Sequence, residues 1–294
     1  MPKIDAFREI LQFNAPTSEL TWLRLGGSIE YLARPRSERE LVELLVACQE
    51  DGIDARVIGD GSAILVSDVG APGMAIQLSE PAFTEIVVDA PRVVAGAGAK
   101  LGRLVTTAVS AGLSGIEGLV GVPGTVGGAV ATNASTTDVS LGQWVTSVRV
   151  ATYDGKLADL TEDELVFGYR DGNLDGAVVL SVELQLEPDS AETLAKRLQK
   201  IWIAREQGRP ELEKGEGYAR LFKNPRGERA ADLISEAGFS GASVGGAKVC
   251  DVNPNLVKTT PNCSSEDVAR LVALIPEQVR ARIGVELESE LHAW

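Results

Sequence analysis

The stretch GIEGLVGVPGTVGGAVATN, residues 115–133, decides the fold, because it is almost free of charge and rich in glycine. Within it, GVPGTVGGAV at 121–130 places four glycines in eight residues. Glycines let backbone N–H groups approach a ligand closely, and such concavities bind phosphate oxygens. We therefore expect this stretch to be buried or to hold a ligand against its backbone. The same composition equally suits a tight turn between buried strands.

Two other glycine segments precede this stretch. GDGSA at 59–63 is a glycine loop that leaves a predicted strand, and GAGAKLG at 96–102 follows a predicted strand over Arg92–Ala95. A helix is expected after GAGAKLG and should end at Gly112. Because GAGAKLG lacks the GxGxxG spacing, the sequence does not support a dinucleotide site of the doubly wound kind.

Periodicity and capping patterns predict a mixed α+β chain. Ser37 and Glu40 form a capping-box pattern that starts a helix, and the spacing of Ile4 and Phe7 predicts a short helix over 4–13. A later helix over 190–207 is expected to turn Trp202 inward. The other predicted elements are strands Ala55–Ile58 and Ala63–Val66, a hairpin of Val145–Thr152 with Leu157–Leu160, strand Val178–Leu186, helices Ala230–Ala237 and Ser265–Ile283, and a final strand Val285–Leu291.

Composition excludes several classes of function. The formal net charge of −14 over 294 residues argues against a nucleic-acid partner. A single histidine, His292, and three cysteines without a CxxC spacing indicate neither a metal site nor a disulfide framework. We find no signal peptide and no apolar run long enough to cross a membrane, so we expect a cytoplasmic protein with no membrane partner.

Three polar motifs are candidate sites, although each alone would more often be a surface feature. They are Tyr169-Arg170-Asp171, the nine residues GYARLFKNP at 217–225, and the alternating carboxylates Glu286, Glu288 and Glu290. Residues that alternate along a strand share one face, so the three glutamates are expected to point the same way.

The order of these motifs resembles one family along residues 15–292. TWLRLGG (21–27), GDGSA, GLSGIEGLVGVPGTVGGA (112–129), FGYRD (167–171), LFKNP (221–225) and GVELESEL (284–291) follow each other as in the UDP-N-acetylenolpyruvoylglucosamine reductases. The resemblance implies an FAD-binding domain of the vanillyl-alcohol-oxidase type, built from two α+β subdomains, and a C-terminal α+β substrate domain. The corresponding segments are 1–80, 81–207 and 208–294.

The resemblance also implies a chemistry. NADPH would reduce FAD, and the flavin would pass hydride to the enolpyruvyl group of a small nucleotide-sugar-like substrate. We expect a monomer or weak dimer. The implied FAD-binding positions are Gly59, Gly61, Ser62, Gly121, Pro123, Gly124, Thr125, Gly127, Gly128 and Asn133.

Catalytic and substrate positions carry over from the same motifs. Arg170 matches the family's arginine and Glu290 its glutamate, which together polarise the substrate. Tyr169, Lys223 and Asn224 match substrate-binding positions.

The sequence departs from the family where ligands bind. Arg220 stands at the position of the serine or cysteine that donates the final proton, and a guanidinium does not release a proton on a catalytic timescale. Asp60 and Asp138 add carboxylates to loops that would face the FAD diphosphate. Two hypotheses follow: a flavoprotein with a changed substrate or protonation step, or an inactive paralogue that binds little or no flavin. In a third, Cys250 supplies the missing acid.

Overall fold

The computed structural model describes residues 2–174 and 176–294 of the chain. These residues form two compact units, each assembled from three segments. Unit 1 contains the chain up to Phe13 together with Tyr31–Asp60 and Gly73–Glu206. Unit 2 contains Asn14–Glu30, Gly61–Pro72 and Gln207–Trp294. No helix among the described residues is long and apolar enough to cross a membrane.

The chain begins with a four-stranded sheet and one long helix. The sheet has the order β1 (Leu11–Pro16), β2 (Ser28–Ala33), β5 (Ala71–Ile76) and β3 (Ala55–Val57). Helix α1 (Glu38–Asp51) begins where the capping pattern predicts, because the Ser37 hydroxyl accepts the Glu40 N–H at 3.2 Å. It ends at Gly52, which has a left-handed φ of 69°. The helix predicted over 4–13 is instead a 3₁₀ helix, η1 (Lys3–Ile10), and strand β1 starts directly after it.

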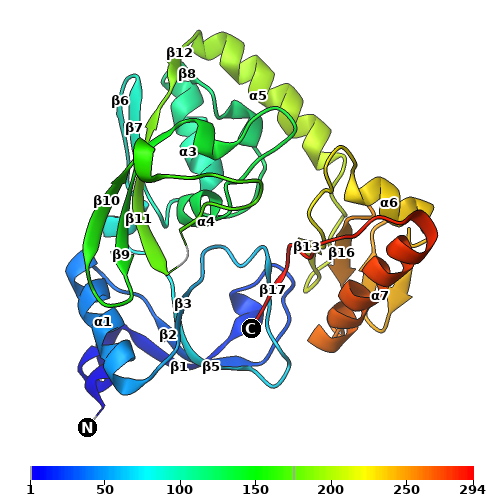
Figure 1. The fold of residues 1–294 in the computed structure, drawn as a ribbon, viewed down its shortest axis with the longest axis horizontal. Coiled ribbons are helices and arrows are strands. Elements are labelled where there is room, and N and C mark those ends of the chain that lie inside the picture. Colours follow the sequence, from blue (N-terminus) through cyan, green and yellow to red (C-terminus); the bar gives the residue numbers. More distant parts are fainter. Residues whose placement is uncertain (1, 175) are drawn as a thin grey trace. The chain divides into compact units, whose positions relative to one another are not determined.

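The second sheet of unit 1 is antiparallel and has five strands. Its order is β10 (Leu157–Thr161), β9 (Val145–Thr152), β11 (Ala177–Gln185), β7 (Arg92–Gly96) and β6 (Ile86–Asp89). The predicted hairpin is confirmed, since β9 and β10 pair around a turn closed by the Gly155 N–H and the Thr152 carbonyl. The helices of this region are α2 (Pro81–Thr84), α3 (Leu101–Ser110), α4 (Val126–Ala131) and α5 (Ala191–Glu206) (Figure 1).

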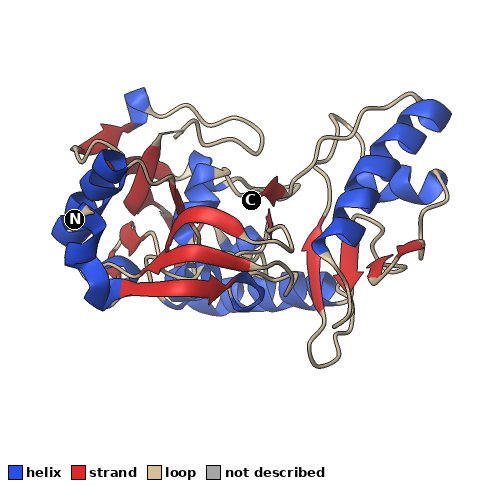
Figure 2. Cartoon of the chain, turned by 90° about the horizontal axis from the view of Figure 1, so that it is seen from below, coloured by secondary structure: helices blue, strands red, loops and turns tan. Residues whose placement is uncertain are grey.

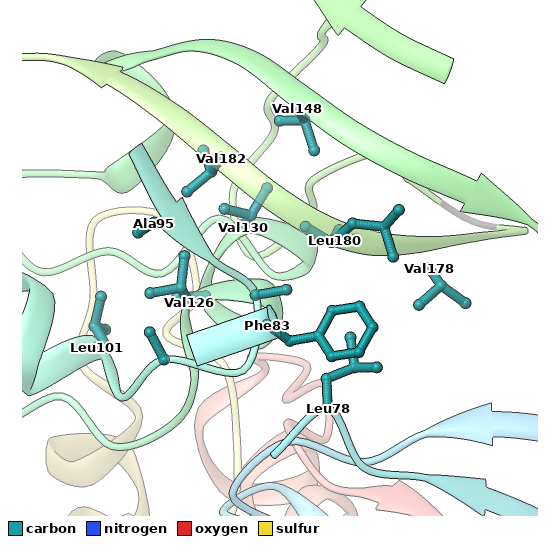
Figure 3. Close-up of a cluster of buried hydrophobic side chains, with 14 of the residues drawn as sticks. Leu78, Phe83, Ala95, Leu101, Val126, Val130, Val148, Val178, Leu180 and Val182 are labelled. Atoms are coloured by element: carbon teal, nitrogen blue, oxygen red, sulfur yellow. The ribbon is translucent and has the colours of Figure 1, made fainter. Parts of the chain in front are cut away.

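Buried aliphatic side chains at alternate positions of β11 place one face of this sheet against the glycine-rich stretch. Val178, Leu180 and Val182 are each 1% exposed, and Val126 and Val130 of α4 pack toward them (Figure 3). The apolar and polar side chains of α4 and of the segment before it that face this sheet are buried, whereas Pro123, Gly128 and Ala131 of residues 115–133 are exposed. The remaining short elements of unit 1 are β8 (Leu113–Ser114), η3 (Glu117–Leu119), η4 (Leu141–Gln143), η5 (Glu162–Glu164) and β12 (Glu187–Pro188).

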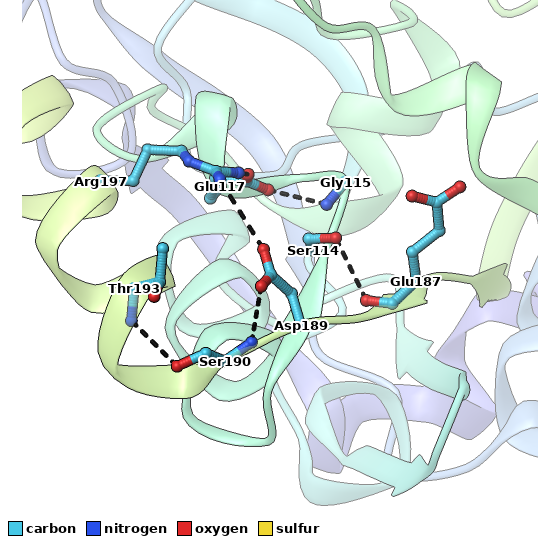
Figure 4. A network of polar contacts seen from close by, with 8 residues as sticks. All are labelled: Ser114, Gly115, Glu117, Glu187, Asp189, Ser190, Thr193 and Arg197. Carbon is cyan, nitrogen blue, oxygen red and sulfur yellow. Dashed lines mark hydrogen bonds and ion pairs between the residues drawn. The ribbon is translucent and has the colours of Figure 1, made fainter.

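Helix α5 packs on unit 1 through Leu194, Leu198 and Ile201, as its spacing predicts, and through polar contacts. Leu194 is its one buried residue, whereas Trp202 is 47% exposed, so the inward placement predicted for Trp202 is wrong. Arg197 instead donates to the buried Glu117 carboxylate at 2.5 Å, and the Gly115 N–H reaches the same carboxylate at 2.7 Å (Figure 4). Arg205 donates to the carbonyls of Gly118 and Val120.

Glu117 gives the protein a pH-dependent contribution to stability. Burial opposes its ionisation, but the N–H groups of Gly115 and of Glu117 itself and the Arg197 guanidinium outweigh this effect and lower its pKa. A lowered pKa stabilises the fold above the unfolded value of about 4.3 and loses that contribution as the pH falls through the folded value. We expect Glu117→Gln to lower the free energy of unfolding at pH 7 by about 2 kcal/mol.

Urea unfolding of the Glu117→Gln variant between pH 7 and pH 3 measures this effect. The gap between parent and variant should shrink as the pH falls through and below about 4.3. Glu192→Gln is the matched control, because its exposed pair with Lys196 contributes little. A gap that stays constant with pH would contradict the proposed role of the Glu117 charge.

Unit 2 is built on a four-stranded antiparallel sheet with two helices. The sheet order is β13 (Gly217–Arg220), β16 (Leu256–Thr259), β15 (Ala247–Val249) and β14 (Ser243–Val244). Helices α6 (Ala230–Glu236) and α7 (Ser265–Ile283) lie beside it (Figures 1 and 2), and α7 ends at Gly284 as predicted. The short elements of unit 2 are η2 (Thr17–Glu19), β4 (Ile64–Leu65) and β17 (His292–Ala293).

The predicted final strand over 285–291 is not a regular strand. Residues 285–291 make only an isolated bridge, Phe222 with Ser289, and the regular pairing begins at β17, which runs parallel to β4. Two backbone hydrogen bonds nevertheless fix this segment beside residues 221–223: Lys223 N–H to the Glu288 carbonyl at 2.9 Å, and Glu290 N–H to the Leu221 carbonyl at 2.8 Å.

Candidate active site

A cavity of about 520 Å³ lies in unit 1. This volume is within the range of sites that bind small molecules and cofactors. The lining residues are Val57, Ile58, Gly59, Gln77, Leu78, Ser79, Thr84, Ala97, Gly98, Ala99, Lys100, Arg103, Thr125, Gly127, Gly128, Ala131, Tyr153, Ala177, Val178 and Val179. All three glycine segments found in the sequence contribute to its wall.

Backbone hydrogen bonds hold two of these segments together. The Val126 N–H donates to the Ala99 carbonyl at 2.8 Å, and the Leu101 N–H donates to the Gly124 carbonyl at 3.0 Å. The third segment approaches at Gly59, where a β-carbon would lie 2.5 Å from Oγ1 of Thr125. Glycine at position 59 is therefore required for the close approach of these two loops.

The amides of the glycine-rich loop are used inside the protein. The Gly127 N–H donates to the Ala97 carbonyl at 2.7 Å, and the Gly128 N–H donates to the Thr125 hydroxyl at 3.3 Å. A β-carbon on Gly127 would lie 2.8 Å from that of Ala97. These glycines thus allow the two segments to pack closely. Together with Thr125, they line the cavity.

The ten residues predicted to bind FAD fall in different places. Gly59, Thr125, Gly127 and Gly128 line the cavity. Gly121, Pro123 and Gly124 lie in the loop that leads to it, and Gly61 and Ser62 belong to unit 2. The tenth, Asn133, braces the backbone.

Asn133 connects the end of α4 to the turn that carries Arg170. It is 6% exposed, its Nδ2 donates to the Gly168 carbonyl at 2.7 Å, and its Oδ1 accepts the Gly142 N–H at 2.9 Å. The Gly172 N–H donates to the Ala131 carbonyl at 2.9 Å, so both ends of the turn are fixed to the region of α4. Arg170 lies in this turn with a left-handed φ of 56°, and its guanidinium lies 5.8 Å from the ring centre of Tyr169.

Two cations of the cavity were not among the sequence candidates. Lys100 and Arg103 lie at the start of α3, and Lys100 forms an ion pair with Asp60. Asp60, which the sequence presents as an uncompensated charge, is thus paired. Lys100 belongs to GAGAKLG, a segment set aside because it lacks the dinucleotide spacing. The partner stands 40 residues away, and no local pattern reveals such a pair.

In unit 2, Arg220 forms an ion pair with Glu290. Arg220 ends strand β13, and its Nε lies 3.7 Å from Oε2 of Glu290. Lys223 makes a second pair with Glu288, whose side chain is 73% exposed. The three alternating glutamates therefore differ in their surroundings: Glu290 is half-buried beside Arg220, while Glu286 and Glu288 are exposed.

The LFKNP segment is braced by Asn255, a residue that the motif alone does not identify. Asn255 is 3% exposed, and its side chain bonds both the N–H and the carbonyl of Phe222, at 2.9 and 2.8 Å. Asn224 turns its Oδ1 to the Ala230 N–H at the start of α6, at 3.0 Å. These bonds fix the backbone that carries Arg220 and Lys223.

Cys250 is buried at the end of β15, and burial raises the pKa of its thiol to about 11. The Cys250 N–H donates to the carbonyl of Leu256 in β16. On its other side, Leu256 pairs with Arg220 of β13. Two strand spacings of about 4.8 Å therefore separate Cys250 from Arg220.

That separation predicts the behaviour of a Cys250→Ala variant. A proton donor must reach its acceptor directly or through one water, so we expect the variant to reduce substrate within about twofold of the parent rate. Steady-state NADPH oxidation measures this. A loss of tenfold or more, with flavin content and thermal stability unchanged, would instead support Cys250 as the acid.

The chain contains an FAD-binding domain. The FAD binding domain family matches residues 29–161, and the C-terminal domain of UDP-N-acetylenolpyruvoylglucosamine reductase matches residues 213–294. The predicted fold class, an FAD-binding domain with a C-terminal α+β domain, is confirmed.

Full-length relatives identify the family. UDP-N-acetylenolpyruvoylglucosamine reductase from Rhodopirellula baltica is 36% identical over 97% of this chain and 93% of its own length. That from Moorella thermoacetica is 36% identical over 96% and 92%. The crystal structure of the Thermus caldophilus enzyme superposes with a TM-score of 0.81 at 32% identity, covering 97% of this chain and 98% of that one. The chain belongs to the UDP-N-acetylenolpyruvoylglucosamine reductase family.

Proposed function

We propose that this protein is an FAD-dependent oxidoreductase that takes electrons from NADPH and reduces the enolpyruvyl group of a UDP-sugar. The observation that carries this proposal is the cavity of unit 1, with its apolar walls and two cations. Because the relatives are named for this reductase, a cavity that fits a flavin supports redox chemistry in this chain.

The cavity fits a flavin cofactor on two counts. Its aliphatic residues, such as Ile58, Leu78 and Val179, suit a flat aromatic ring, and Lys100 and Arg103 suit a diphosphate. Gly59 and Gly127 keep β-carbons out of the contacts that shape the wall. Bound FAD would supply hydride transfer, and the protein would supply position and charge.

The substrate residues are proposed to act through charge. Arg170 would bind the enolpyruvyl carboxylate with its two-pronged guanidinium, because this geometry matches a carboxylate. Glu290 would stabilise the enol that develops after hydride reaches the β-carbon. Tyr169, Lys223 and Asn224 would contact the nucleotide-sugar portion.

The final proton is the altered step. Reduction of the double bond needs one hydride at the β-carbon and one proton at the α-carbon. Arg220 cannot supply that proton, since a guanidinium does not release its proton on a catalytic timescale. We propose that solvent delivers the proton slowly, or that Arg220 selects a substrate with an additional carboxylate.

The ion pair between Arg220 and Glu290 favours a second candidate function. A carboxylate held by a guanidinium at 3.7 Å is less able to polarise a substrate, as in a paralogue that binds a ligand without turnover. The visible absorption band of oxidised flavin, after FAD addition and desalting, tests for cofactor retention. NADPH oxidation that depends on UDP-N-acetylglucosamine enolpyruvate then separates the two candidates. A yellow protein without such oxidation would contradict the reductase.

A further inference from the structure

The charged side chains that line the unit 1 cavity come from one short segment of the chain. Among the described residues that line it, Lys100 and Arg103 are the two that carry charge. They are adjacent, because Lys100 precedes the first residue of α3 and the Arg103 N–H donates to the Lys100 carbonyl at 3.0 Å. The anionic part of any ligand in this cavity is therefore drawn toward these two cations.

A carboxylate lies beside Lys100. Asp60 follows the lining residue Gly59, and its carboxylate is paired with Nζ of Lys100. The Asp60 side chain is 21% exposed and the Lys100 side chain is 62% exposed. Two like charges about 4 Å apart repel by about 4 kcal/mol near a protein surface, so an uncompensated Asp60 would oppose a diphosphate strongly.

We propose that Lys100 is the charge-compensating residue of the cofactor site, and that it lets the site bind a diphosphate ligand beside Asp60. Arg103, which lines the same cavity, supplies positive charge to the diphosphate itself. This inference rests on the FAD site of the proposed function, and it assigns roles to Lys100 and Asp60 that the family motifs do not carry.

The fold does not depend on the Lys100 side chain. The backbone of this segment makes the structural contacts, through Ala99 and Leu101 to the 124–126 loop. The amine lies on an exposed side chain, and exposed ion pairs contribute about 0–1 kcal/mol to stability. A Lys100→Met variant should therefore fold, and its effect should fall on ligand binding.

A double-mutant cycle on FAD affinity tests the proposal. The protein is stripped of flavin and titrated with FAD, and the quenching of flavin fluorescence gives the Kd. Lys100→Met should weaken binding by about tenfold or more, because it leaves the Asp60 carboxylate uncompensated beside the diphosphate. Asp60→Asn should tighten binding by about threefold, and Lys100→Met/Asp60→Asn should return to within about threefold of the parent.

Glu192→Gln is the matched control, since it removes one carboxylate from an exposed lysine pair of unit 1 that does not line the cavity. Its Kd should equal that of the parent. The proposal is overturned if Lys100→Met binds FAD as the parent does. It is also overturned if the double variant is as weak as Lys100→Met, because Lys100 would then be a phosphate contact that does not compensate Asp60.

The two proposals can fail separately. A parent that binds FAD but does not oxidise NADPH with the enolpyruvyl substrate contradicts the proposed function and leaves the charge cycle intact. If the enzyme is active but the effects of the Lys100 and Asp60 substitutions on the Kd for FAD simply add, only the role of Lys100 is contradicted. A parent that binds no FAD contradicts both.

Discussion

An Arg220→Ser variant is expected to reduce UDP-N-acetylglucosamine enolpyruvate faster than the parent protein does. A positioned general acid contributes typically 10²–10⁴-fold, and we expect a gain in kcat of about 10–100-fold because the surrounding side chains are shaped around arginine. The backbone at position 220 is fixed by β13 and by Asn255, so the hydroxyl would occupy a defined place. The substitution also frees Glu290 from its ion pair.

Arg220→Ala separates these two effects. Alanine removes the guanidinium and releases Glu290, but it offers no proton. Steady-state NADPH oxidation should therefore rise for serine and much less for alanine. If Arg220→Ser binds FAD and NADPH yet gains no activity, the missing proton donor is not the only change that limits reduction. If alanine gains as much as serine, the guanidinium inhibits by occupying space or by holding Glu290.

A Gly98→Ala variant is expected to lose FAD binding and much of the stability of unit 1. A β-carbon at this position would lie 1.6 Å from the Leu78 carbonyl oxygen and 3.2 Å from that of Phe83. Both neighbours are backbone atoms of buried residues, so the chain must move to relieve the overlap. Such overpacking costs about 3 kcal/mol or more, and it displaces Leu78 and Gly98 from the cavity wall.

Gly102→Ala provides the matched control four residues later. A β-carbon there meets no atom within 4 Å, and the residue lies in helix α3. Alanine should therefore raise the free energy of unfolding by about 0.5 kcal/mol and leave the Kd for FAD unchanged. Urea unfolding and FAD titration measure both variants. A Gly98→Ala protein as stable as the parent would contradict the packing described at Leu78.

The elements predicted correctly are those with local signals. Ser37 begins α1 and Gly284 ends α7 through bonds within a few residues, which a sequence pattern contains. Trp202 was misplaced because it stands at the edge of the apolar stripe: Leu194, Leu198 and Ile201 pack against the core, whereas Trp202 is exposed. The final strand was misjudged because alternation does not reveal whether a partner strand is present.

The candidate site divides in the same way. The glycine segments were recognisable because glycine at close approaches is visible in the sequence, and Gly59, Thr125, Gly127 and Gly128 do line the cavity. Lys100 was missed because its meaning depends on Asp60, and the two meet only after the strands and loops have folded. The role of a charged residue at a site therefore depends on residues that are close in space but distant in sequence.

The interleaving of the two units has a consequence for autonomous folding. The apolar core of unit 2 includes Leu23 and Leu25, and the Thr259 hydroxyl donates to the Leu23 carbonyl at 2.8 Å. Leu23 and Leu25 precede β13 by almost two hundred residues in the sequence. The C-terminal segment that matches a family as a separate domain, residues 213–294, therefore contains only part of its own core. During synthesis, the early segment must wait for nearly the whole chain before this core can close.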